Sequence, residues 1–172
     1  QQELWSAFTS ECEAAFEIVN APTPGTLFRY GEALTEQERF NEAAEVYERA
    51  LMISPGDAQI ILGFARMLAR SGKEQEAEAL PATALHDQNP VRRAEDRAFL
   101  ISLLAEIRRR RGEPALALQT FHDFIERDLV DFSAEIGPIP AIEYAEALID
   151  LGRRSEAQQF VARLHAAWPD HP

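Results

Sequence analysis

The residues in this sequence that are best suited to bind a charged ligand are a run of four arginines, residues 108–111. Planar guanidinium groups bind carboxylates and phosphates, so the run could hold an acidic peptide or a phosphate group. Cations in the last turn of a helix also interact favourably with the helix dipole and the open carbonyl groups, and Gly112 follows where a helix would end. We therefore favour a structural role for these arginines.

The histidines and the single cysteine lack the spacing that catalysis or metal binding requires. His86, His122, His165 and His171 are scattered, and no HExxH, GxGxxG, GxxxxGKS/T or GxSxG motif occurs. Cys12 alone can form neither an internal disulfide nor a thiolate zinc cluster, and we expect it to pack as a small hydrophobic residue. The sequence therefore predicts no catalytic residue, no cofactor and no metal site, and the chain is not expected to be an enzyme.

Charge and hydropathy limit the partners that this chain can have. Its 172 residues carry a formal net charge of −12, which repels the phosphates of nucleic acids and anionic membranes. No run of roughly 18 apolar residues is present, so membrane insertion is not expected. Lys73 is the only lysine, a bias towards arginine that favours a GC-rich bacterial source. The start, Gln1-Gln2-Glu3, lacks a methionine, and we expect a processed form or part of a longer polypeptide.

Helix-forming residues and regularly placed small residues describe the elements that position these groups. Ala, Leu, Glu and Arg are enriched, which predicts an all-helical protein. One stretch carries a small, a small, an aromatic and a helix-ending residue at Gly31, Ala43, Tyr47 and Pro55. This spacing predicts two short helices that touch at Gly31 and Ala43.

The order and spacing of these residues resembles the tetratricopeptide repeat, a unit of 34 residues. Four units share the small-residue positions, which are Gly31, Ala65, Ala105 and Ala145 on the first helices and Ala43, Ala77, Ala117 and Ala157 on the second helices. The resemblance implies an all-α fold, a right-handed α-solenoid of antiparallel helix pairs. We expect one domain over residues 24–172, with pairs at 24–57, 58–97, 98–137 and 138–171, preceded by a capping helix and linker over residues 1–23.

Several positions depart from the repeat pattern. Glu38 stands where the family often has Gly, so the first turn is expected to be tighter or less regular. Pro81 lies inside a predicted second helix, and we expect a kink or an early break near Leu80. Extra residues are predicted to lengthen one helix to about residues 90–111, and residues 128–137 are predicted to form an irregular insertion.

The resemblance also implies that the first helices line a concave groove for a protein or peptide. The predicted groove residues are Arg29, Glu32, Leu62, Arg66, Arg70, Ser102, Glu106, Arg109 and Glu146. Family members that grip a C-terminal carboxylate carry Lys, Asn and Arg at places that here hold Phe28, Glu32, Gly63, Ser102 and Glu106. That clamp is absent, and the mixed groove suits an extended or helical segment of mixed character.

The last helix, over residues 155–167, predicts a contact with a second chain. Phe160, Leu164 and Trp168 recur at four-residue spacing, whereas terminal repeats normally present a polar outer face. We therefore expect a homo-oligomer through this end. Our hypothesis is a non-catalytic scaffold in a bacterial assembly; the alternatives are an oligomerisation module or the repeat portion of a larger enzyme with its catalytic domain elsewhere.

Overall fold

The computed structural model describes Trp5, Ala7 and residues 9–10, 22–86, 93–125 and 128–169. These residues form two compact units, with the boundary between Leu80 and Pro81. All regular structure in the described residues is helical, which confirms the all-α prediction. The predicted capping helix and linker over residues 1–23 lie mostly outside the described residues, and Cys12 lies outside them.

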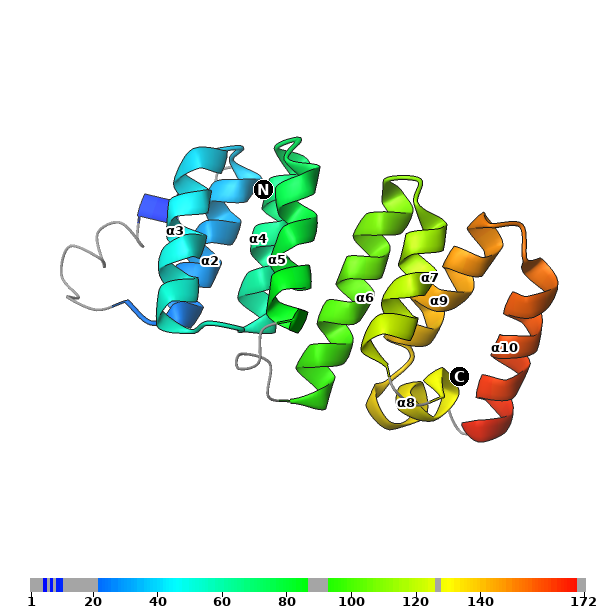
Figure 1. Cartoon of the computed structure of the whole chain (residues 1–172). Coiled ribbons are helices and arrows are strands. Elements are labelled where there is room, and N and C mark those ends of the chain that lie inside the picture. The colour runs from blue at the N-terminus through cyan, green and yellow to red at the C-terminus, as the bar shows by residue number, and fades with distance from the viewer. Residues whose placement is uncertain are drawn as a thin grey trace. The chain divides into compact units, whose positions relative to one another are not determined.

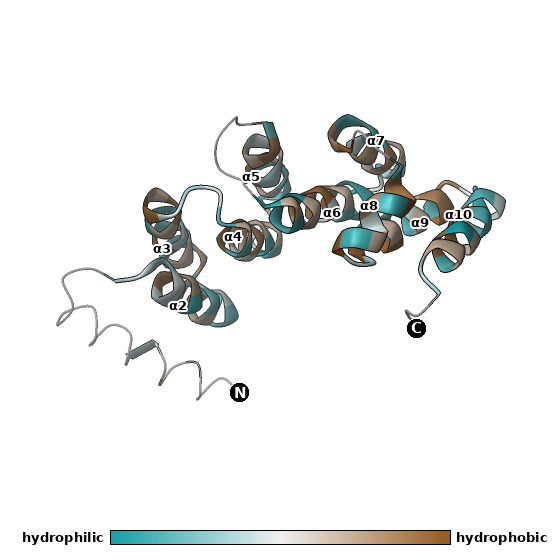
Figure 2. Ribbon diagram, turned by 90° about the horizontal axis from the view of Figure 1, so that it is seen from below, coloured by the Kyte–Doolittle hydropathy of each residue, from teal (hydrophilic) through white to brown (hydrophobic). Residues whose placement is uncertain are grey.

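Unit 1 contains α2 (Pro24–Glu36), α3 (Phe40–Ile53), α4 (Ala58–Arg70) and the first half of α5 (Glu74–His86). The helices follow one another as antiparallel neighbours, and each carries hydrophobic and hydrophilic residues (Figures 1 and 2). Side-chain caps define two helix starts, because Thr23 Oγ1 accepts a hydrogen bond from the Thr26 amide and Asp57 accepts from the Gln59 and Ile60 amides.

The core of unit 1 is organised around the ring of Tyr47 on α3. A Cβ atom added to Gly31 would lie 2.8 Å from Cζ of this ring, and one added to Gly63 would lie 3.1 Å from its hydroxyl oxygen. The ring also stacks on Phe64, with centroids 5.5 Å apart. Glycine therefore lets α2 and α4 approach the same aromatic side chain.

The turn at Glu38 is regular, contrary to the sequence-based expectation. Glu38 has φ of 60°, close to the 82°, 79° and 75° of Gly72, Gly112 and Gly152 in the other turns. In all four turns the next amide donates to the carbonyl five residues back, at 2.8–2.9 Å. The backbone thus imposes the same left-handed turn on Glu38, although a side chain is disfavoured there.

Unit 2 contains the end of α5 and five further helices: α6 (Ala94–Arg110), α7 (Pro114–Phe124), α8 (Leu129–Ile136), α9 (Ile139–Asp150) and α10 (Arg154–Ala167). Helix α6 begins at Ala94, so the predicted start near residue 90 is wrong. The segment predicted to be irregular forms α8, because the Asp128 carboxylate accepts a 2.8 Å hydrogen bond from the Val130 amide and caps the helix.

Helix α5 continues through Pro81 to His86, so the predicted early break near Leu80 is wrong. Proline removes one backbone hydrogen bond, but its side chain here is fully buried. Burial of the apolar ring offsets part of the cost of the lost hydrogen bond. Packing therefore overrides the local helix-breaking tendency at this position.

Candidate functional site

The exposed side of α2 and α4 gathers five of the predicted groove residues, and we call it the α2–α4 face. It consists of Arg29, Glu32, Leu62, Arg66 and Arg70, of which only Leu62 is half-buried. Within the described residues, Arg29 and Arg66 form no ion pair. Burial raises the pKa of Glu32, while the charges of Arg29 and Arg66 oppose that rise. The two arginines therefore lie near Glu32 but keep their donors available to a ligand.

Arg70 is tied within this face, unlike Arg29 and Arg66. Its Nη1 donates to Glu36 Oε1 on α2 at 2.6 Å, and both side chains are about half exposed to solvent. An exposed pair of this kind contributes little stability, about 0–1 kcal/mol. Its geometric effect is to link α4 to α2. The predicted groove residue Arg70 thus joins two neighbouring helices.

The corresponding side of unit 2 is already crowded with charge. Arg109 on α6 forms ion pairs with three carboxylates of α9, at 3.5 Å to Glu143, at 3.2 Å to Asp150 and also with Glu146. Burial lowers the pKa of Arg109, but its hydrogen bond to Asp150 and the nearby carboxylates raise it overall. Burial raises the pKa of Glu143, and the nearby carboxylates of Glu106 and Glu146 raise it further, although the positive charge of Arg109 lowers it. Arg109 and Glu146 therefore join α6 to α9.

The remaining predicted groove residues of α6 also have partners in the chain. Ser102, expected in the groove, lies in the core instead, where its hydroxyl donates to the Ala98 carbonyl at 3.0 Å. Glu106 pairs with Arg110 at 2.7 Å, one helical turn away. Of the predicted groove, only the α2–α4 face thus offers exposed cations without ion pairs in the described structure.

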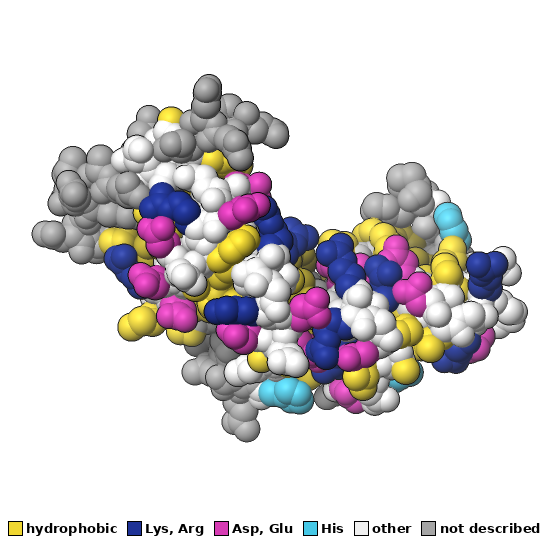
Figure 3. Space-filling model, turned by 90° about the horizontal axis from the view of Figure 1, so that it is seen from above, with side chains coloured by type: hydrophobic (Ala, Val, Ile, Leu, Met, Phe, Trp, Pro, Cys, Tyr) yellow, Lys and Arg dark blue, Asp and Glu magenta, His cyan; other side chains and the backbone are white. Residues whose placement is uncertain are grey.

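The arginine run of residues 108–111 is used structurally. Arg108 donates to the Thr120 hydroxyl of α7 at 2.9 Å, and Arg111 pairs with Glu113 at 3.0 Å. Arg109 is paired with carboxylates of α9, and Arg110 is paired with Glu106. On the face that Figure 3 shows, basic and acidic side chains are interspersed within each unit. The run therefore connects helices, in agreement with the structural role favoured from the sequence.

The residues predicted to contact a second chain lie mainly against their own chain. Phe160, expected at an oligomer contact, is instead buried with Val130, Ala141 and Ala145, and Leu164 packs against this cluster. Trp168 is half-buried just after α10, and its amide donates to the Leu164 carbonyl at 2.9 Å. The apolar surface that α10 exposes is at Val161.

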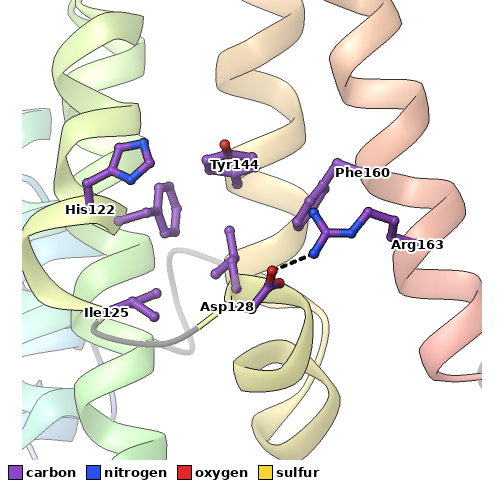
Figure 4. Close-up of a pocket in the computed structure, with 8 residues that line it drawn as sticks. His122, Ile125, Asp128, Tyr144, Phe160 and Arg163 are labelled. Atoms are coloured by element: carbon purple, nitrogen blue, oxygen red, sulfur yellow. Dashed lines mark hydrogen bonds and ion pairs between the residues drawn. The ribbon is translucent and has the colours of Figure 1, made fainter.

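A pocket of about 260 Å³ in unit 2 was not foreseen from the sequence (Figure 4). The rings of Phe121, Tyr144 and Phe160 line it, with neighbouring centroids 5.5 and 4.8 Å apart. At its polar side, Arg163 of α10 donates to the Asp128 carboxylate at 2.5 Å. The Val130 amide and Arg163 both lower the pKa of Asp128.

This pocket is smaller than ordinary ligand sites, which occupy roughly 300–1,000 Å³. Its volume suits one side chain better than a cofactor, and its polar pair is an ion pair between two helices. The signal that could have revealed it is Asp128 directly before Leu129 and Val130, an N-cap followed by apolar residues.

Among the described residues, no group of three or more His, Cys, Asp or Glu side chains could hold a metal ion. None of the helices described is long and apolar enough to cross a membrane.

Comparison with known proteins supports the repeat assignment. Residues 34–96 match the family model of the tetratricopeptide repeat. No curated protein matches the sequence. Among solved structures, Pseudomonas aeruginosa pilF is similar over 96% of this chain and 74% of its own, with 16% identity and a TM-score of 0.64.

Two further solved structures share this fold. YrrB, described as a TPR protein with an unusual peptide-binding site, is similar over 93% of this chain and 76% of its own, with 18% identity and a TM-score of 0.54. The MamA protein is similar over 84% of this chain and 72% of the MamA chain, with 14% identity and a TM-score of 0.53. At these identities the likeness establishes a helical-repeat fold.

Proposed function

We propose that this chain is a non-catalytic scaffold that binds a segment of another protein on the α2–α4 face, in keeping with the tetratricopeptide repeat match over residues 34–96 and with the helical-repeat fold. The observation that carries this proposal is the pair Arg29 and Arg66, exposed on neighbouring first helices without an ion pair in the described structure. Other cations on the first helices, such as Arg70 and Arg109, already hold carboxylates of the chain.

The chemistry of the face favours a ligand with both carboxylates and apolar side chains. Two guanidinium groups with free donors bind carboxylates through charge-assisted hydrogen bonds. Phe28 and Leu62 are half-buried on the same helices and offer apolar surface beside them. Three arginines against Glu32 and Glu36 give the face a formal charge of only +1. We therefore expect local pairing rather than long-range attraction to dominate binding.

The peptide-binding site named for YrrB supports this proposal by analogy of fold. An extended or helical segment laid across two parallel first helices contacts both Arg29 and Arg66. Binding of this kind needs no bond making or breaking, which is consistent with a scaffold. The wider assembly, bacterial in our hypothesis, would be built from such contacts.

Charge reversal at Arg66 tests this function. The probe is a fluorescently labelled peptide in which Asp or Glu alternates with Leu or Phe, titrated at low and high salt. Loss of a charge-assisted hydrogen bond costs about 1.5–3 kcal/mol, so Arg66→Glu is expected to weaken binding by about tenfold or more. Arg49→Glu is the matched control, because Arg49 is also exposed but lies on α3.

Equal binding by Arg66→Glu and the unmodified protein would refute the assigned surface. Equal binding of a peptide with Asn and Gln in place of the acidic residues would refute the assigned ligand chemistry. Failure of the unmodified protein to bind any such peptide would refute both.

A further inference from the structure

The pocket in unit 2 is lined by buried rings inside and by exposed polar groups at its rim. Phe121 and Phe160 are 3% and 7% exposed, and Tyr144 is half-buried beside both rings. Asp128 and Arg163 are exposed. Figure 4 shows these side chains around one space, to which α7, α9, α10 and the start of α8 contribute. The pocket is therefore apolar within and open to solvent at its polar side.

The walls of this pocket are complete within unit 2. Asp128 and Leu129, at the start of α8, form one wall. Val130 of α8 packs with Ala141 of α9 and Phe160 of α10, which fixes the extra helix against the last helix pair. In unit 1 the connection from α3 to α4 spans only residues 54–57 and contains no helix. The pocket is therefore a consequence of α8, an insertion that the repeat pattern does not require.

The rim has spare hydrogen-bond donors, whereas its acidic group is already engaged. Oδ1 of Asp128 accepts from the Val130 amide at 2.8 Å, and Oδ2 accepts from Arg163. Arg163 has no other partner within the described chain, so its remaining N–H groups are available. His122, across the pocket on α7, has no hydrogen bond to any described residue. An occupant must therefore bring hydrogen-bond acceptors to the rim.

We propose that this pocket receives one aromatic side chain of a partner protein, with an acidic residue next to it in the partner's sequence. A cavity of about 150 Å³ is large enough for benzene, so a volume of about 260 Å³ accommodates a phenol or an indole ring. Such a ring gains edge-to-face contacts with the rings that line the pocket. The neighbouring carboxylate then accepts hydrogen bonds from Arg163 at the rim. Aromatic side chains that fill a pocket in this way dominate the binding energy of many interfaces.

An NMR titration of the isotope-labelled full chain with a short peptide tests the proposal. The probe is Gly-Asp-Trp-Ser-Gly with blocked ends, so that its aspartate is the only carboxylate. Amide signals at the end of α7, at the start of α8 and around Arg163 are expected to shift and to saturate. One anchored side chain predicts weak binding, with a dissociation constant of about 0.1–1 mM. The same peptide with Leu in place of Trp is expected to bind about tenfold more weakly, because it lacks the ring contacts.

Two substitutions distinguish a donor to the ligand from a support between helices. Arg163→Gln removes the charged donor and is expected to weaken binding by about tenfold. Asp128→Asn breaks the same ion pair but keeps an N-cap for α8, so the freed Arg163 is expected to tighten binding by up to about fivefold. Arg154→Gln is the matched control, because Arg154 is also an exposed arginine of α10 but does not line the pocket. Circular dichroism verifies that each variant is folded.

The absence of saturable shifts in unit 2 at about 5 mM peptide would overturn the proposal. Equal weakening by Arg163→Gln and Asp128→Asn would show that their ion pair only supports the pocket, and would overturn the donor role of Arg163. Equal binding of the leucine peptide would overturn the aromatic occupant. Tighter binding of free phenylacetate would assign a small aromatic acid and overturn the protein partner. Binding on the α2–α4 face is measured separately with the leucine form of the acidic peptide, so either proposal can fail without the other.

Discussion

Gly31→Ala is expected to destabilise the protein, although alanine occupies the same place in the other three helix pairs. The new Cβ would lie 2.8 Å from Cζ and 2.9 Å from Cε1 of Tyr47. The Tyr47 ring is unable to move towards solvent, because it is buried and stacked on Phe64. It is also unable to move towards α4, where Gly63 leaves no room for more than a hydrogen. The substitution therefore forces a shift of the backbone of α2 or α3.

The expected size follows from two opposing effects. Overpacking a well-packed core costs about 1–3 kcal/mol, and alanine is about 1 kcal/mol better than glycine inside a helix. The net loss is therefore about 1 kcal/mol, which lowers Tm by roughly 2–4 °C for a chain of this length. Urea unfolding followed by circular dichroism, with thermal unfolding as a second measurement, gives both quantities.

A double-mutant cycle isolates the contact between residues 31 and 47. In a Tyr47→Leu background the ring atoms that oppose the new Cβ are absent, so Gly31→Ala should become stabilising by about 1 kcal/mol. The coupling between the two substitutions is then about 2 kcal/mol. A Gly31→Ala protein as stable as the unmodified chain, or a coupling near zero, would refute the account of how α2 and α3 pack.

Two further substitutions test the turn and the cap that the structure revealed. Glu38→Gly should raise the free energy of unfolding by about 0.5–1 kcal/mol, because the left-handed backbone costs a side chain about 1–2 kcal/mol and glycine loses about 0.5–1 kcal/mol of entropy; unchanged or lower stability in urea unfolding would contradict this. Asp128→Ala should lower stability near pH 7 by about 1 kcal/mol through loss of the α8 cap. Because the folded-state pKa of Asp128 is lowered, its contribution is present at neutral pH and is lost as pH falls through that pKa, so a difference that persists near pH 2 would argue against the cap.

The sequence predicted the helix pairs well because small residues at Gly31, Ala65, Ala105 and Ala145 are local requirements of close helix packing. It failed where tertiary packing decides the outcome. Pro81 stays helical because its side chain is buried, and Phe160 is buried by its own chain although its spacing indicated an exposed stripe. Helical periodicity alone does not distinguish a face that meets a partner from a face that meets the core.

The candidate site was predictable only in part, for a related reason. Arg66 and Arg109 look equivalent in the sequence, since both are placed on first helices. The structure separates them, because the three carboxylates that hold Arg109 come from α9, at least 34 residues further along the chain. Which arginines remain available to a ligand therefore depends on contacts between helices distant in sequence.

The most direct test of the proposed scaffold function is an NMR titration of the isotope-labelled chain with the acidic, apolar peptide. The account predicts that backbone amide signals of α2 and α4, around Arg29 and Arg66, shift in proportion to the peptide bound. It also predicts that signals of α9 and α10 remain unchanged when the apolar residues of the peptide are leucine. Shifts confined to unit 2, or no saturable shift at all, would contradict the assignment of the α2–α4 face as the binding surface.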